Sequence, residues 1–392
     1  MTRPRTLIAV LVYNGRAFVP ACLRSAARLS EAEPGVDVLV LDDCSPERGW
    51  SEELAALGRE LGIGCYRSPR NLGIPRNMNL GLLRALTAGY DHVVIANSDV
   101  LFPLNFVDAV VAAVRSDASI GSLTPWSNDV SIYSLTSLSE LGRGKGLADV
   151  RLDLVDWFSS VLQGEFGTES LDIPTGVGFC LVMAVEAVRR VGLFDPVFGR
   201  GYCEEVDWCL RARAAGLRNV LGPSSFVYHA GRGSTEGLGM LAQGQTTVWA
   251  NERIVDMRHP DYRSQIAAFL GTGALEGLRS RAEGSIVREA ARARGYSLEI
   301  SGLRRPRPAD GLVRFVVSPE DNGSVAVGTY LGATTSLPLN GQGVIRGLGS
   351  MLGRPPREVR IFDQGRQGES VAREAATLSI ATVDARGYPE TI

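Results

Sequence analysis

Cysteine and histidine are rare in this sequence, which has six cysteines and three histidines among its 392 residues. No two cysteines form a Cys-x-x-Cys pair, and all six lie in or beside apolar segments. This pattern favours reduced, mostly buried thiols over a disulfide framework. Because thiols stay reduced in the cytosol, the sequence predicts a cytoplasmic location.

The sequence also lacks long apolar runs and an excess of charge of one sign. No stretch approaches the ~20 apolar residues that a membrane-spanning helix needs. The run Leu7 to Val12 follows two arginines but is too short for a secretion signal and lacks a small-x-small cleavage site, so we expect a first β-strand there. The 41 Lys and Arg nearly balance the 43 Asp and Glu. Neither nucleic acid nor an anionic membrane is therefore expected as the main partner, and only peripheral membrane association stays open.

Length and composition predict a globular protein of two or three units, since 45% of residues are hydrophobic and 21% are charged. In roughly the first 115 residues, buried-type strands alternate with helical segments. The expected strands are 6–14, 36–43, 64–68 and 92–99, and the expected helices are 18–29, 52–61, 75–87 and 105–114. This alternation predicts a doubly wound α/β unit with a mostly parallel sheet, in which ligands bind outside the carboxyl ends of the strands.

The rest of the chain changes character twice. After a long polar loop at 126–146 and an apolar block at 175–184, a helical stretch of about 65 residues begins near position 235. Beyond Ser301, an Arg/Pro-rich linker precedes short predicted strands at 313–318, 325–331 and 359–362. We therefore expect a first α/β domain at 1–235, a helical extension at 236–300 and a small β-containing domain at 301–392.

Polar residues end the first two predicted strands. Tyr13 and Asn14 end the first, and Asp42 and Asp43 end the second. A tyrosine ring can stack on a nucleobase, and a carboxylate can accept hydrogen bonds from a base N–H or a ribose hydroxyl. The alternative is that Asp43 only caps the following turn. A dinucleotide-binding domain would need Gly-x-Gly-x-x-Gly after the first strand, and residues 14–18 do not supply it.

Two later segments suit phosphate and metal binding. Residues 70–81 run from a turn into a helix that Pro75 is placed to begin, so helix amides and Arg76 could hold a diphosphate. The fourth strand ends in Asn97-Ser98-Asp99. Mg²⁺ typically takes one or two carboxylates plus substrate phosphates, a role that Asp99 fits. Plain turn residues and a structural aspartate are the alternatives.

Acidic residues gather at the start of a predicted helix, where Glu204, Glu205 and Asp207 lie within four positions. The helix dipole favours acids at this end, but a carboxylate here is also well placed to act as a general base. His229 closes an apolar run further on. It is either a packed core residue or a metal ligand.

In this order the elements resemble family 2 glycosyltransferases of the GT-A fold, particularly bacterial rhamnosyltransferase-like members, over roughly residues 6–235. The matching motifs are Tyr13-Asn14, Asp42-Asp43-Cys44-Ser45, Asn71-Leu72-Gly73 with Asn79-Leu80-Gly81, Asn97-Ser98-Asp99, Gly176 to Met183 with Gly192-Leu193-Phe194-Asp195, Glu204-Glu205-Val206-Asp207, and His229. The resemblance implies inverting, Mg²⁺- or Mn²⁺-dependent transfer of a sugar from a nucleotide-diphosphate donor. The acceptor would be a hydroxyl of a glycan, polysaccharide or natural product.

The resemblance also implies a role for each matched residue. Asp43 contacts the base, Asp99 is the main metal ligand, His229 is a second ligand and Glu205 is the general base. The implied donor-binding residues are Tyr13, Asn14, Asp43, Asn71, Gly73, Arg76, Asn79, Asn97 and Ser98. Asn97 replaces the first acid of the stricter metal motif. Glu205 stands where Asp is usual, which leaves Glu204 and Asp207 as rival bases.

Two other functions compete with this prediction. One is a non-catalytic scaffold that binds nucleotide sugars, motivated by Asn97 and the unmatched tail. The other is a sugar-1-phosphate nucleotidylyltransferase, although the Gly-rich basic loop that it would want after the first strand is missing. We expect the loops at 126–172 to select the substrates. The tail after Ser301 is expected to serve acceptor recognition or self-association, which suits a homodimer.

Overall fold

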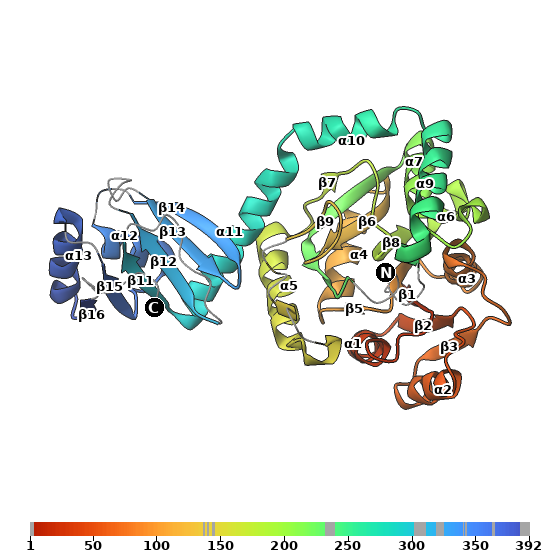
Figure 1. The fold of residues 1–392 in the computed structure, drawn as a ribbon, viewed down its shortest axis with the longest axis horizontal. Coiled ribbons are helices and arrows are strands. Elements are labelled where there is room, and N and C mark those ends of the chain that lie inside the picture. The colour runs from red at the N-terminus through yellow and green to blue at the C-terminus, as the bar shows by residue number, and fades with distance from the viewer. Residues whose placement is uncertain are drawn as a thin grey trace. The chain divides into compact units, whose positions relative to one another are not determined.

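The computed structural model describes residues 4–135, 138, 141–142, 146–231, 240–301, 311–318, 325–339, 341, 343–362 and 365–384, with only the backbone at 240–247. The chain forms two compact units (Figure 1): Met1–Thr136 with Gly142–Leu275, and Ser137–Leu141 with Glu276–Ile392. The predicted fold class is confirmed. The Arg/Pro-rich linker and the domain boundary predicted at 235 lie outside the described residues.

The first unit is built on an eight-stranded sheet with the order β3-β2-β1-β4-β8-β6-β9-β7. Its strands are β1 (Thr6–Val12), β2 (Val36–Asp42), β3 (Gly64–Arg67), β4 (His92–Asn97), β6 (Ile120–Trp126), β7 (Leu171–Asp172), β8 (Cys180–Ala184) and β9 (Arg218–Phe226). β3, β2, β1 and β4 are mutually parallel, as predicted, and β8 joins β4 in the antiparallel direction.

The position of β1 explains where a ligand can bind. The chain moves outward from β1 to β2 and β3, and then returns across β1 to form β4 on its other side. In open α/β sheets, such a reversal of strand order leaves a crevice outside the carboxyl ends of the strands. Tyr13, Asp43 and Asn97 lie at this end of β1, β2 and β4.

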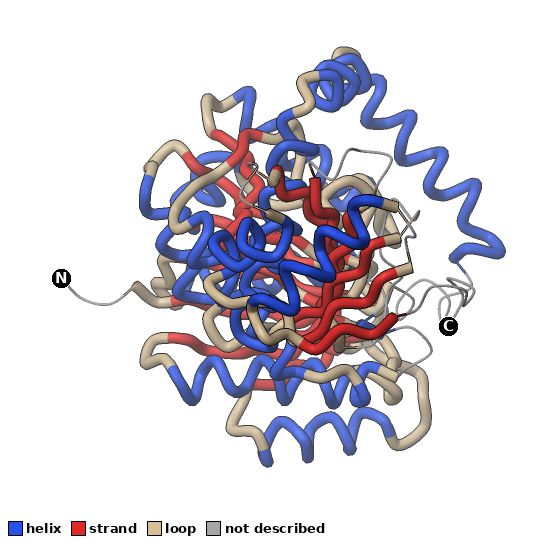
Figure 2. The backbone as a smooth tube through the Cα atoms, turned by 90° about the vertical axis from the view of Figure 1, so that its left-hand side faces the viewer, coloured by secondary structure: helices blue, strands red, loops and turns tan. Residues whose placement is uncertain are grey.

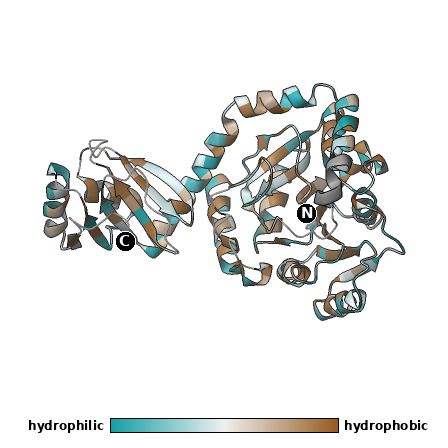
Figure 3. Ribbon diagram, in the orientation of Figure 1, coloured by the Kyte–Doolittle hydropathy of each residue, from teal (hydrophilic) through white to brown (hydrophobic). Residues whose placement is uncertain are grey.

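Helices cover both faces of this sheet (Figure 1) because its strands are apolar on both sides (Figure 3). One face carries α1 (Val19–Ala32), α4 (Phe106–Ser116) and α5 (Leu152–Phe166). The other carries α3 (Ile74–Thr87), α6 (Val185–Val191) and α7 (Glu204–Ala214), while α2 (Trp50–Glu60) packs beside β3. The expectation of loops throughout 126–172 was wrong, because α5 buries Leu154, Phe158 and Leu162 of its apolar face.

Three further helices confirm the predicted helical stretch: α9 (Met240–Arg258), α10 (Tyr262–Gly271) and α11 (Ala274–Arg294). In α9, Val255 packs against Phe198 and Leu210. Short 3₁₀ turns occur at Leu147–Asp149 and at Pro196–Phe198, which is η3. Among the described residues, no helix is both long and apolar enough to cross a membrane. All six cysteines are free thiols and three of them are buried.

The second unit contains a six-stranded sheet with the order β14-β13-β12-β11-β15-β16. Its strands are β11 (Tyr296–Ile300), β12 (Val313–Val317), β13 (Val325–Tyr330), β14 (Ala333–Pro338), β15 (Glu358–Ile361) and β16 (Ala381–Asp384), and its other helices are α12 (Val344–Leu352) and α13 (Arg366–Thr377). Figure 2 distinguishes these helices and strands by colour. The three strands predicted here are confirmed. β11 lies centrally, paired with β12 and β15.

Candidate active site

A cavity of about 390 Å³ opens at the carboxyl ends of β1 and β2. It is lined by Tyr13, Asp43, Asn71, Leu72, Gly73, Ile74, Arg76, Gly199 and Arg200. Five of the predicted donor-binding residues thus come together around one space. Gly199 and Arg200 were not predicted to line a binding site. Arg200 lies only four residues before Glu204, and its positive charge could have indicated a site for an anionic ligand.

Asp43 fixes the loop that forms one wall of this cavity. Its two carboxylate oxygens accept hydrogen bonds from the backbone N–H groups of Leu72 (2.7 Å) and Gly73 (2.9 Å). The Asn71 side chain also accepts from Gly73, at 3.1 Å. Burial raises the pKa of Asp43, and the two N–H donors offset part of that rise. Each carboxylate oxygen can accept a second hydrogen bond, so Asp43 can both cap the turn and contact a ligand.

Gly73 is required where this loop meets the residues before α7. Its φ of +80° is a left-handed backbone conformation, and a Cβ placed on it would lie 2.2 Å from the carbonyl oxygen of Gly199. No side chain fits at that distance. The absence of a Cβ therefore allows two cavity walls, one from the loop after β3 and one from the loop before α7, to approach each other.

Asp99 and His229 are brought together by a two-stranded ribbon. β5 (Val100–Leu101) pairs antiparallel with β10 (Tyr228–His229), which sets His229 opposite Val100. The backbone N–H of Ala230 also donates to the carbonyl of Asp99 at 2.9 Å. As a result, Nε2 of His229 lies 3.3 Å from Oδ1 of Asp99. Both predicted metal ligands thus share one buried location.

The surroundings of His229 orient its ring. Nδ1 lies 2.7 Å from the carbonyl oxygen of Asp129, which can only accept, so Nδ1 carries the hydrogen and Nε2 faces Asp99. Asn128 holds the His229 backbone through two hydrogen bonds of 2.9 and 2.7 Å. Burial lowers the pKa of His229, but the hydrogen bond and charge of Asp99 and the contacts with Asp129 outweigh it, so the pKa is raised. Asp99 and Asp129 therefore favour the protonated form of the His229 ring.

This pair of donors fits a divalent cation. A carboxylate oxygen suits Mg²⁺ and Mn²⁺, and an imidazole nitrogen adds a softer ligand that Mn²⁺ accepts more readily than Mg²⁺ does. Within the described residues, no group of three or more His, Cys, Asp or Glu side chains forms a complete metal site. Other ligands would have to be phosphate oxygens and water. Asn97 and Ser98 immediately precede Asp99 and are not among the residues lining the cavity at Asp43.

Glu205 lies at the first turn of α7 against the segment that precedes β8. A Cβ placed on Gly178 would be 3.7 Å from Oε1 of Glu205, and the Gly178 backbone hydrogen-bonds to this carboxylate. The next residue, Phe179, accepts a 2.8 Å hydrogen bond from the Asn97 backbone N–H, and its ring centroid lies 5.3 Å from that of His229. The segment Gly178–Phe179 therefore contacts Glu205 as well as Asn97 and His229.

The three candidate bases lie in different environments. Glu205 is partly exposed, whereas Glu204 is 4% exposed and Asp207 is 1% exposed. Burial raises the pKa of both glutamates, and the charge of Glu205 raises that of Glu204 further. A general base must reach the proton that it abstracts, so exposure favours Glu205.

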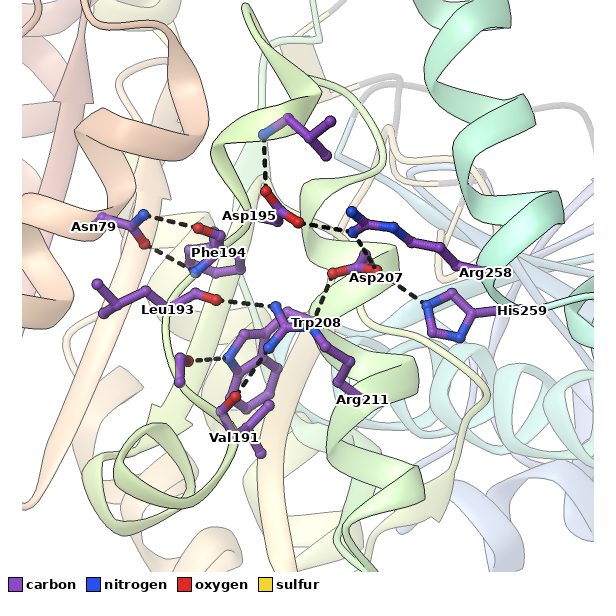
Figure 4. A network of polar contacts seen from close by, with 12 residues as sticks. Asn79, Val191, Leu193, Phe194, Asp195, Asp207, Trp208, Arg211, Arg258 and His259 are labelled. Carbon is purple, nitrogen blue, oxygen red and sulfur yellow. Dashed lines mark hydrogen bonds and ion pairs between the residues drawn. The ribbon is translucent and has the colours of Figure 1, made fainter.

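Asp207 and Asn79 belong to one network of polar contacts (Figure 4). Asp207 accepts from Arg211 at 2.8 Å and pairs with Arg258 and His259. Asn79 exchanges two 2.9 Å hydrogen bonds with the backbone of Phe194. Arg211 and Trp208 donate to the carbonyls at 191–193. Asn79 and Asp207 thus hold the Gly192–Asp195 motif against α3 and α7, and neither lines the cavity.

The charge of Asp207 should make folding stability depend on pH. Burial raises its pKa, but His259, Arg211 and Arg258 outweigh burial and lower it below its ordinary value. A lowered folded-state pKa contributes stability above the unfolded value, and this contribution disappears as pH falls through the folded value. We expect Asp207→Asn to lose about 3 kcal/mol of unfolding free energy near pH 7, because it removes a buried charge that pairs with Arg211 and Arg258.

Urea denaturation at about pH 7 and about pH 3 would test this, with a smaller difference from the parent expected at the acidic pH. Asp117→Asn is the control, because Asp117 pairs with Arg218 at the surface and its loss should change stability little. An equal loss at both pH values in Asp207→Asn would contradict the charge-based explanation.

Comparison with known proteins found similarity to glycosyltransferases. Residues 7–192 match the family model described as "Glycosyl transferase family 2". No curated protein matches the chain. Similar solved structures include the mannosyltransferase PcManGT from Pyrobaculum calidifontis in complex with GDP-Man and Mn²⁺ (18% identity, TM-score 0.43, 75% of this chain and 76% of that one). GalNAc-T7 with UDP, GalNAc and Mn²⁺ is also similar (15% identity, TM-score 0.42, 58% of this chain and 44% of that one). S. aureus TarS 1–349 in complex with UDP-GlcNAc is another (14% identity, TM-score 0.40, 57% of this chain and 58% of that one).

The family match gives residues 7–192 the sequence features of a glycosyltransferase. Over residues 7–192 the first unit of the chain resembles glycosyltransferase family 2, as the order of motifs predicted. The chain spans only 44% of the length of the GalNAc-T7 chain.

Proposed function

We propose that this glycosyltransferase is a metal-dependent, inverting enzyme that moves a sugar from a nucleotide-diphosphate sugar to an acceptor hydroxyl. The segment Gly178–Phe179 supports this proposal most directly. It contacts Glu205 and also contacts Asn97 and His229. A carboxylate able to accept a proton and a pair of donors able to hold a cation therefore share one end of the sheet.

The cavity at Asp43 would bind the donor nucleotide. The ring of Tyr13 offers a surface on which a base can stack, and Asp43 can accept a hydrogen bond from a base N–H. Arg76 and Arg200 line the same space and supply positive charge for the diphosphate. Asp99 and His229 would hold Mg²⁺ or Mn²⁺, and the cation would neutralise charge on the departing nucleoside diphosphate.

Glu205 would accept the proton of the acceptor hydroxyl while that oxygen attacks the anomeric carbon. Burial raises the pKa of Glu205, which makes its carboxylate a stronger base than an exposed glutamate. The backbone of Gly178 orients the carboxylate through a hydrogen bond. In a single in-line displacement the sugar leaves the diphosphate as the acceptor bonds on the opposite side, so the anomeric centre inverts.

Nucleotide binding tests the proposal. In the presence of Mn²⁺, the matching nucleoside diphosphate should raise the melting temperature, since a ligand at about 100 times its Kd adds about 2.7 kcal/mol of stability. Gly73→Ala should lose this stabilisation because its Cβ would meet Gly199. Gly89→Ala is the matched control, because Gly89 has a similar φ of +71° and open space around it. The proposal is wrong if no nucleoside diphosphate stabilises the parent protein.

The non-catalytic scaffold is the second candidate, because Asn97 leaves the site one carboxylate fewer than an Asp-x-Asp motif would give. A scaffold would bind the same nucleotide and neither hydrolyse nor transfer the sugar. A nucleotidylyltransferase would instead release inorganic diphosphate. Product analysis with each stabilising nucleotide sugar, and separately with the matching sugar 1-phosphate and nucleoside triphosphate, distinguishes these three functions.

We propose that the second unit serves acceptor recognition or self-association, with a cytoplasmic homodimer as the assembly. Because β11 is paired with β12 and β15, a cut after Ser301 would divide this sheet. Removal of residues 274–392 avoids that division. We expect the shortened protein to keep nucleotide binding and to lose oligomer mass or acceptor affinity. Loss of nucleotide binding from a folded, shortened protein would refute this role.

A further inference from the structure

The five residues before Glu204 follow an unusual backbone path. Gly199, Gly201, Tyr202 and Cys203 all have left-handed φ values, of 61°, 127°, 74° and 72°. Tyr202 and Cys203 carry side chains, for which this conformation is unfavourable, so contacts from outside the segment must maintain it. We call residues 198–203 the pre-α7 segment. Because α7 begins directly after this segment, the backbone conformation of the segment determines the position of Glu205.

One side of the pre-α7 segment packs against the start of α3. A Cβ on Gly201 would lie 2.6 Å from Cδ1 of Ile74, and Gly73 approaches Gly199 equally closely. The Ile74 N–H donates to the carbonyl of Arg200 at 3.4 Å. These contacts form the wall of the donor cavity. The carbonyl of Phe198 accepts from the Gly201 N–H at 3.0 Å, and the carbonyls of Gly201 and Tyr202 are satisfied from another element.

Asn251 of α9 satisfies three of those carbonyls. Its side-chain nitrogen donates to Phe198 (3.0 Å), Gly201 (2.8 Å) and Tyr202 (3.0 Å). The residue is 5% exposed. An amide nitrogen has two hydrogens, so three carbonyls share them and all must converge on one point. The backbone conformation of the pre-α7 segment therefore requires a small hydrogen-bond donor at position 251.

The carboxyl end of α9 provides a second attachment. Arg258 pairs with Asp195 at 2.8 Å, before the pre-α7 segment, and with Asp207 at 3.3 Å, inside α7. His259 reaches the same carboxylate at 3.0 Å. Glu205 thus lies between two points at which α9 holds the chain.

We propose that Asn251 is a positioning residue for Glu205, and this inference rests on the proposed role of Glu205 as general base. Asn251 sets the direction in which the first turn of α7 presents the carboxylate, and it does not itself contact the substrate. Small displacements of a reacting group are costly, since a shift of about 1 Å can reduce a rate about 10²-fold. The residue lies outside the part of the chain that matches the family model, which ends at residue 192.

Two substitutions and a control test this inference in the full-length protein. Asn251→Asp removes both N–H donors and points oxygen at three carbonyls, whereas Asn251→Ser keeps one donor and is the milder change. We expect kcat to fall about 10–100-fold in Asn251→Ser and further in Asn251→Asp. The Kd of the stabilising nucleoside diphosphate should change less than about threefold, because the α3 contacts remain. Asn105→Ala, which removes a partly buried hydrogen bond to Gln163, should leave both quantities unchanged.

A double-mutant cycle with Glu205→Gln distinguishes positioning from a general structural effect. If Asn251 acts through Glu205, Asn251→Ser should lower kcat less than about threefold once Glu205 is already glutamine. A further 10–100-fold fall in the double mutant overturns the inference and leaves Glu205 as the base. Unchanged kcat in folded Asn251→Ser also overturns it. Near-normal turnover in Glu205→Gln alone instead refutes the proposed base, and the positioning role with it.

Discussion

Glu205→Gln should lower kcat by about 10²–10⁴-fold while the donor Kd stays within a few-fold of the parent value. The substitution keeps the size of the side chain and removes its ability to accept a proton. Glu205 is not among the residues lining the donor cavity, so nucleotide binding has no reason to weaken. Single-turnover transfer assays and nucleotide titration on the same preparation measure the two quantities separately.

The neighbouring acids provide matched controls. Glu204→Gln changes a side chain that is 4% exposed, which limits its access to an acceptor hydroxyl, whereas Glu205 is partly exposed. It should therefore lower kcat less than about tenfold. Asp207→Asn should mainly lower stability, as argued from its pairing with Arg211, Arg258 and His259. Near-normal turnover in Glu205→Gln together with an inactive Glu204→Gln would identify Glu204 as the base.

Asp99→Asn should abolish metal-dependent activity, with a loss of roughly 10²-fold or more. Without the Asp99 carboxylate, the site would retain only the neutral imidazole of His229 from this pair of ligands, and the diphosphate would lose its counterion. Mn²⁺ should restore activity to the chelator-treated parent and fail to restore it to the variant. Asn128→Ala should have a smaller effect, about 10–100-fold in metal affinity, because Asn128 only holds the His229 backbone. Full activity of the parent in excess chelator would rule out the metal site.

The first four strands and the helices between them were predictable because their signal is local. Strands buried on both faces must be apolar throughout, and helices repeat their apolar residues every three or four positions. The ends of β1, β2 and β4 agree with prediction to within two residues. Tyr13, Asp43 and Asn97 were recognisable as candidates because polar side chains interrupt such strands only where the sheet ends.

Other features of the fold and of the site depend on contacts between residues far apart in sequence, which no local pattern predicts. The apolar face of α5 lies between two polar segments of the sequence, so residues 126–172 were predicted to form loops. Arg200 was missed because its place at the cavity depends on the close approach of Gly73 to Gly199. Asn251 gave no signal at all, since its partners lie about 50 residues earlier in the chain.

The sequence by itself determined the class of fold, the end of the sheet at which chemistry occurs and the set of candidate acids. These follow from hydrophobic periodicity and from motifs a few residues long. Only the tertiary structure decided which of the candidate residues lie together, which are accessible and which are buried. It set His229 beside Asp99 through the β5–β10 ribbon, left Glu205 partly exposed, and buried Asp207 beside Arg211 and Arg258. The physical reason is that burial and charge pairing depend on which distant segments pack together, and no local pattern specifies that.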